Sequence, residues 1–262
     1  MSSARRLVLT AMAAAVALGV AACGGGGGEQ QQAAPPARTL TVSAAASLTD
    51  VYNQLGTQFE QANPGTTVRF NFGGSDTLAQ QVVQGVPADV LATASTRTMQ
   101  TAQQANRIQG QPVTYAANQL QIAVQPGNPK QIANLQSLVG PQVTESICAP
   151  AVPCGAATEA AERAAGVTLD PVSEEQDVRS VLQRVITRNV DAGLVYVTDV
   201  KSTNGQVQGI DFPQATAQGA AQNYLIGAVA GSPNADLAQQ WIAFVTGPQG
   251  DAALTQAGFQ LK

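Results

Sequence analysis

Apolar and polar residues alternate along the chain in two rhythms. From Thr39 onward, short β-branched runs are followed by longer segments in which apolar residues recur every three or four positions, as Leu48, Val51, Leu55 and Phe59 do. Runs of the first kind predict strands, and segments of the second kind predict helices with one buried face. We expect strands at 38–44, 66–72 and 88–94, with helices between them at 47–62 and 75–85. Such a βαβαβ succession indicates a parallel sheet covered by helices.

The same alternation begins again further along the chain. We expect strands at 118–126, 143–149, 191–199 and 205–212, and helices at 155–166 and 174–189. They are followed by a last strand at 223–231 and by two closing helices at 235–247 and 248–258. Two α/β units, with a final strand and helices that return to the first unit, predict two lobes with a ligand cleft between them. One doubly wound domain with a long sheet would give a similar pattern.

The N-terminus is typical of an export signal. Two arginines precede an apolar, alanine-rich segment at 7–23, which is too short for a comfortable membrane span. Its last four residues, Val20–Cys23, resemble the lipobox of bacterial lipoproteins, in which the signal is cut before a cysteine that receives a diacylglycerol. We therefore expect a signal peptide at 1–22, a lipid anchor on Cys23 and a flexible tether at 23–38. The alternative is an ordinary secretory signal with a chance cysteine near its end.

The composition excludes several kinds of function. The 262-residue chain contains no histidine, which removes the commonest general base and the commonest metal ligand. Without the two arginines of the signal, 11 basic residues face 17 acidic ones, a net charge of −6. An acidic chain of this kind argues against nucleic acid as a partner. Any anion that it binds must be held by local geometry.

Two further cysteines lie close together in the second half of the chain. Cys148 and Cys154 are separated by five residues. In an exported protein, oxidising conditions favour a disulfide between them. Two buried free thiols are the alternative.

Two serines stand where strands are predicted to run into helices. Ser47 follows three alanines, and Ser75 follows two glycines. A serine at such a junction can cap the helix with its own oxygen. Alternatively, the free N–H groups of the helix start can hold an anion, which the small neighbours would allow to approach closely. Asp76 is unfavourable for an anion, but its carboxylate also suits the helix dipole and can point to solvent.

The second half offers weaker signals of the same kind. Cys154 and Gly155 run from a turn into a helix, so that backbone N–H groups there can face a cleft. Val178 and Arg179 open another predicted helix, where a buried valine and a solvated arginine would be the ordinary interpretation. Tyr196 ends a strand, and it is either a core aromatic residue or a hydroxyl donor in a cleft.

From Thr39 to the C-terminus, the chain resembles the periplasmic molybdate-binding proteins of ABC importers. The motifs that carry the resemblance occur in the family's order and spacing: AAASLTD, SDTLAQQ, GVPADVLATA, VPCGAATEA, DVRSVL, GLVYVTD and GPQGDAAL. The resemblance implies the two-lobed α/β fold of type II periplasmic binding proteins. Lobe I would comprise 39–118 and 224–262, and lobe II would comprise 119–223.

The resemblance also implies a ligand set. Molybdate or tungstate would be held by the hydroxyls of Ser47, Ser75 and Tyr196 and by the main-chain N–H groups of Cys154 and Val178. The family often has serine or threonine where Asp76 stands here, and often alanine in place of Cys154. A main-chain contact leaves the Cys154 side chain free to enter a disulfide.

We accordingly expect an extracytoplasmic, lipid-anchored and monomeric receptor that passes its ion to a membrane permease. It would have no enzymatic activity, no cofactor and no direct ligand from protein to metal. Another tetrahedral oxyanion, sulfate or phosphate, is an alternative ligand, and Asp76 would favour phosphate because its carboxylate can accept a proton. An exported hydrolase with Ser47 or Ser75 as nucleophile lacks both a histidine base and a GxSxG motif.

Overall fold

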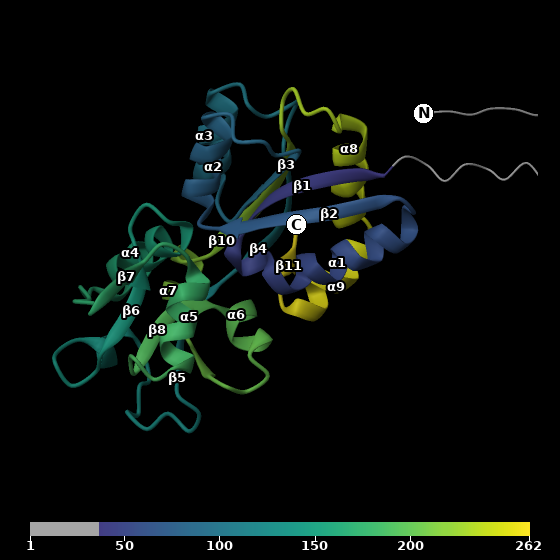
Figure 1. Ribbon diagram of the computed structural model, residues 1–262. Helices are drawn as coiled ribbons and strands as arrows, with labels where there is room; N and C mark the ends of the chain where they lie inside the picture. Colours follow the sequence, from purple (N-terminus) through teal and green to yellow (C-terminus); the bar gives the residue numbers. More distant parts are fainter. Residues whose placement is uncertain (1–36) are drawn as a thin grey trace, which may run out of the picture. The chain divides into compact units, whose positions relative to one another are not determined.

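The computed structural model describes residues 37–262, which belong to one compact unit (Figure 1). The expected signal peptide, Cys23 and all but the end of the expected tether lie outside the described residues. Within 37–262, no helix has the length and apolar character needed to cross a membrane.

The first lobe is built on a six-stranded sheet with the order β11-β4-β10-β3-β1-β2. Its strands β1, β2 and β3 are parallel, as predicted, whereas β10 runs antiparallel to both β3 and β4. The final strand thus returns to the first sheet. The strands of this sheet are β1 (Arg38–Ala45), β2 (Thr66–Gly73), β3 (Val90–Thr93), β4 (Val113–Asn118), β10 (Gln222–Ala228) and β11 (Gln260–Leu261).

Helices cover both faces of this sheet (Figure 1). Along β3, Val90 and Ala92 belong to the core on the side of α1 and α8, and Leu91 belongs to the core on the side of α2 and α3. This alternation is what a strand buried on both faces requires. The helices of the first lobe are η1 (Ala46–Leu48), α1 (Thr49–Ala62), α2 (Ser75–Val83), α3 (Thr96–Gln104), α8 (Ala235–Val245) and α9 (Pro248–Ala257).

The second lobe is built on a five-stranded sheet with the order β7-β6-β8-β5-β9. Strand β6 pairs in parallel with β7 and β8, and β5 pairs antiparallel with β8 and β9. Its strands are β5 (Leu120–Val124), β6 (Glu145–Cys148), β7 (Ser173–Glu175), β8 (Ala192–Tyr196) and β9 (Gln208–Asp211). Its helices are η2 (Leu135–Leu138), α4 (Pro153–Ala165), α5 (Val178–Ile186), α6 (Val197–Ser202) and α7 (Gln214–Gly219).

One predicted helix begins later than the sequence pattern indicated. The helix expected at 174–189 is α5, which begins at Val178, and Ser173–Glu175 instead form the edge strand β7. The backbone of β7 pairs with β6, and the side chain of Asp177 then caps α5 by accepting a hydrogen bond from the N–H of Ser180 at 3.0 Å. The pairing of β7 with β6 and the cap by Asp177 together set the start of α5 at Val178, whereas helical periodicity predicted an earlier start.

Candidate functional site

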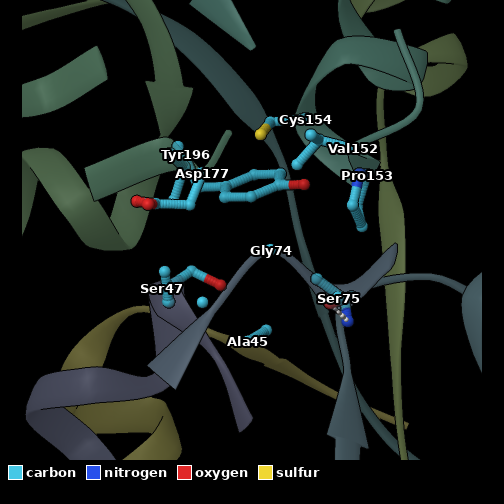
Figure 2. A pocket seen from close by; sticks show the side chains of 13 residues that line it. Ala45, Ser47, Gly74, Ser75, Val152, Pro153, Cys154, Asp177 and Tyr196 are labelled. Carbon is cyan, nitrogen blue, oxygen red and sulfur yellow. Dashed lines mark hydrogen bonds between the residues drawn. The ribbon is translucent and has the colours of Figure 1, made fainter. Parts of the chain in front are cut away.

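A small pocket lies at the seam between the two lobes (Figure 2). Water-sized spheres can be centred in only about 10 Å³ of it, far below the range of about 300–1,000 Å³ that is usual for sites of organic ligands. The pocket therefore suits a small ion. Its lining includes all five residues of the expected ligand set: Ser47, Ser75, Cys154, Val178 and Tyr196.

Four helices point their N-termini at this pocket. Helices η1, α2, α4 and α5 each follow closely on a parallel strand, namely β1, β2, β6 and β7. Ligands in open α/β sheets bind outside the carboxyl ends of such strands. Because the first N–H groups of a helix have no partner within it and carry partial positive charge, the four helix starts together favour an anion.

Ser47 lies within the short helix η1 and does not cap it, since no side chain caps η1 or α1. The N-cap interpretation of this serine is therefore wrong. Its oxygen instead lies 2.7 Å from the hydroxyl oxygen of Tyr224, and both residues are buried. When Tyr224 donates this hydrogen bond, the Ser47 proton is free to be donated into the pocket.

Ser75 is the first residue of α2, where Gly74 stands at the N-cap position. Its oxygen accepts a hydrogen bond from the main-chain N–H of Ala94 at 3.0 Å, which Figure 2 marks with a dashed line. An N–H can only donate, so the Ser75 hydroxyl is an acceptor in this bond and keeps its own proton to donate. The Ser75 proton is therefore available for a ligand in the pocket.

Tyr196 supplies a third hydroxyl. It is 1% exposed, and its oxygen has no hydrogen-bond partner among the described residues. Burial raises the pKa of this phenol well above its usual value, so the hydroxyl stays protonated. A buried donor without a partner is unfavourable by about 1–3 kcal/mol, and a bound anion would remove that penalty. The main-chain N–H of Tyr196 is held by the carboxylate of Asp199 at 3.0 Å.

Cys154 and Val178 bring main-chain donors from the second lobe. They lie in the first turns of α4 and α5, ahead of Ala156 and Val181, whose N–H groups make the first main-chain bonds of these helices. Both side chains are buried, and that of Cys154 is bonded to Cys148 in the predicted disulfide. Their N–H groups are therefore available to a ligand while their side chains pack in the lobe.

Acceptors and cations are scarce in the pocket. Its lining residues, all within the described part of the chain, include no lysine or arginine, and Asp177 is their only carboxylate. That carboxylate accepts bonds from the N–H and the hydroxyl of Ser180, each at 3.0 Å, and it points away from the Tyr196 hydroxyl in Figure 2. The side chains of the pocket thus offer mainly hydrogen-bond donors.

Asp76 is not a lining residue. One of its carboxylate oxygens is buried without a hydrogen-bond partner among the described residues, whereas the sequence suggested that this group could point to solvent. The carboxylate lies beside Gly74, where an added Cβ would be 2.8 Å from the buried oxygen. Asp76 therefore lies beside Gly74 but does not form part of the pocket wall.

Two residues outside the expected ligand set support the pocket. Tyr224 comes from β10, far along the chain from Ser47, so no local pattern connects the two. Gly74 passes so close to the main-chain oxygen of Gln176 in the second lobe that an added Cβ would be 2.4 Å from it. Two adjacent glycines in the sequence were the available signal for this close approach. Within residues 37–262, no cluster of acidic or cysteine side chains could hold a metal ion directly.

Known proteins resemble this chain in sequence and in fold. The sequence pattern of bacterial extracellular solute-binding proteins matches residues 40–260. The chain is 43% identical over 223 residues to the molybdate-binding protein ModA of Mycobacterium tuberculosis, and the match covers 85% of each chain.

Two solved structures have a similar fold. The periplasmic molybdate-binding protein of Azotobacter vinelandii matches with a TM-score of 0.75 at 19% identity, over 85% of this chain and 99% of that one. The sulfate-binding protein SubI of Mycobacterium tuberculosis matches with a TM-score of 0.72 at 17% identity, over 85% and 86%. These matches confirm the predicted two-lobed, type II periplasmic-binding-protein fold. At such identities they do not distinguish one oxyanion from another.

Proposed function

Because the chain belongs to the family of bacterial extracellular solute-binding proteins, we propose that it captures molybdate, and also tungstate, for an ABC importer. The function is binding and not catalysis, since the family consists of solute-binding proteins. The relative at 43% identity is a molybdate-binding protein, which favours this ion over other small solutes.

The observation that carries the proposal is the donor character of the pocket. Ser75 keeps its proton to donate while its oxygen accepts from Ala94, and the buried hydroxyl of Tyr196 lacks a partner among the described residues. Molybdate is a fully deprotonated dianion at neutral pH, so it needs donors only. We propose that Ser47, Ser75 and Tyr196 bind it through their hydroxyls, and Cys154 and Val178 through their main-chain N–H groups.

Phosphate fits this pocket less well. Its monohydrogen form carries a proton that must be accepted, and a carboxylate is the usual acceptor. Asp76 does not line the pocket, and the carboxylate of Asp177 binds Ser180 and points away from the Tyr196 hydroxyl (Figure 2). Sulfate, which carries no proton, would have to be rejected by size, because a fixed ring of donors fits one ionic radius best.

Delivery to the permease requires the ion to be enclosed and then released. We propose that lobe I (39–118 and 224–262) and lobe II (119–223) close over the ion, so that the permease recognises the closed form. The receptor would work as a monomer. It would be held outside the cytoplasm by a lipid on Cys23, a residue outside the described part of the chain. Labelling with a radioactive fatty acid tests the anchor, since a Cys23→Ser variant should take up no label.

Calorimetric titration tests the ligand. The protein from residue 39 onward is titrated in parallel with molybdate, tungstate, sulfate and phosphate at neutral pH. We expect sub-micromolar dissociation constants for molybdate and tungstate and much weaker binding of the other two. Tighter binding of sulfate or phosphate than of molybdate would overturn the proposal.

A further inference from the structure

The two lobes are joined by an ion pair close to the pocket. Arg179 of the second lobe bonds through its Nη2 to the carboxylate of Asp50 in the first lobe. Resting on the proposed function, we propose that this pair is a latch: it stabilises the closed form and so slows the release of the bound oxyanion. The sequence suggested a solvated arginine at this position, whereas the side chain of Arg179 is 26% exposed.

Each residue of the pair lies within three positions of a proposed ligand donor. Asp50 lies in the first turn of α1, three residues after Ser47, and Arg179 directly follows Val178 at the start of α5. When the pair forms, it therefore brings together the two walls that carry Ser47 and Val178. Neither Asp50 nor Arg179 lines the small pocket itself. They act on the ion through the position of the lobes.

Arg179 is oriented by its own lobe. Its Nε lies 3.1 Å from Oδ1 of the fully buried Asp199, and its Nη1 donates to the hydroxyl of Ser202 at 3.0 Å. Burial raises the pKa of Asp199 to about 6, so this carboxylate is ionised at neutral pH and Arg179 balances its charge. Asp199 also accepts a hydrogen bond from the main-chain N–H of Tyr196. The Arg179 guanidinium is thus connected through Asp199 to Tyr196, which lines the pocket.

Asp50 is the residue of the pair that would lose its partner if the lobes separated. Its side chain is 59% exposed even with the pair formed, and its only ion-pair partner among residues 37–262 is Arg179. Opening would leave Asp50 in water while Arg179 kept Asp199 and Ser202. Closure thus adds one charge-assisted contact between Asp50 and Arg179. Because Arg179 is already held by its own lobe, forming this contact loses less side-chain entropy than usual.

Whether removing the Asp50 charge speeds or slows release of the ion distinguishes a latch from simple charge repulsion. Asp50 is a negative charge near a site for a dianion, so its removal alone would strengthen binding by relieving repulsion. A latch predicts the opposite, namely faster release. An exposed ion pair contributes little, so we expect roughly a threefold increase in koff, in line with the range measured for such pairs.

The test measures molybdate release from Asp50→Asn by stopped flow. The matched control is Asp236→Asn, which breaks an exposed pair with Arg38 that lies wholly within the first lobe, at 2.6 Å. We expect koff to rise about threefold for Asp50→Asn, and to stay at the wild-type value for Asp236→Asn and for the charge-conserving Asp50→Glu. The apo melting temperature of Asp50→Asn should not fall. Arg179→Gln is a poorer probe, because it also leaves Asp199 buried without its partner.

Salt provides a second readout. Rising ionic strength should increase koff of the wild type towards that of Asp50→Asn, while the variant changes less. The latch would be overturned if Asp50→Asn released molybdate no faster than the wild type, or if Asp236→Asn raised koff as much as Asp50→Asn does. Either result would leave the proposed molybdate site intact. A wild-type protein that binds none of the four oxyanions would overturn the proposed function, and the latch with it.

Discussion

Removing the hydroxyl of Tyr196 should weaken anion binding without weakening the free protein. In Tyr196→Phe, the ring that fills its place in the second lobe is kept and a single oxygen is lost. That oxygen is buried and has no hydrogen-bond partner among the described residues, so no hydrogen bond within residues 37–262 is broken. The substitution therefore isolates the proposed contact with the ion.

The magnitude follows from the kind of hydrogen bond. A bond between a neutral hydroxyl and a buried dianion is charge-assisted, and such bonds contribute about 1.5–3 kcal/mol. The loss corresponds to a Kd for molybdate that is roughly 10- to 150-fold higher. Because the variant removes a buried donor that lacks a partner, the apo melting temperature should be unchanged or slightly higher.

Calorimetry and thermal unfolding are measured on the same preparation of Tyr196→Phe. A variant that binds molybdate as tightly as the wild type would refute the role given to this hydroxyl. A large loss of apo stability would also contradict this role, because it would mean that the Tyr196 oxygen stabilises the fold.

Three further substitutions test other parts of the account. Gly74→Ala should raise the Kd for molybdate and lower the apo melting temperature only slightly. The backbone accepts a Cβ (φ −62°, ψ 130°), and only the end of the Asp76 side chain, 2.8 Å away, must shift within the lobe, whereas the main-chain oxygen of Gln176 at 2.4 Å would oppose lobe closure. Wild-type affinity would contradict this. Tyr224→Phe should raise that Kd several-fold by leaving the Ser47 hydroxyl without its partner, and calorimetry would detect it. Burial raises the pKa of Glu145 to about 7, so the stability that its protonated form contributes is complete below about pH 4.5 and is lost as the pH rises through 7. Melting curves should therefore show Glu145→Gln equal to the wild type at low pH and more stable at pH 8, and a constant difference would contradict the assignment.

Much of the fold follows from local patterns because its strands and helices are strongly periodic. The βαβαβ start of the first lobe was predicted with the correct directions, since short connections from helix to strand favour parallel pairing. The antiparallel insertion of β10 between β3 and β4 was not, because pairing between residues more than a hundred positions apart leaves no local trace. The short strand β7 was mistaken for a helix start because its three residues carry no strand pattern of their own and are set by pairing with β6.

The proposed site was accessible from the sequence only through motifs. Serines next to small residues at strand ends indicated helix starts that could face a ligand, but they equally suited N-caps. The structure excludes capping by Ser47, because its oxygen lies beside Tyr224. The roles of Tyr224, Gly74 and the pair of Asp50 with Arg179 depend on how distant segments meet, which composition and spacing do not encode.

The most direct test of the central claim is an anomalous diffraction map at the molybdenum absorption edge, from crystals grown with molybdate. We expect one molybdenum peak in the pocket between the lobes. Oxygens around it should lie at about 2.7–3.2 Å from the hydroxyls of Ser47, Ser75 and Tyr196 and from the N–H groups of Cys154 and Val178. A peak outside this pocket, or an oxyanion held by lysine or arginine side chains, would contradict the account.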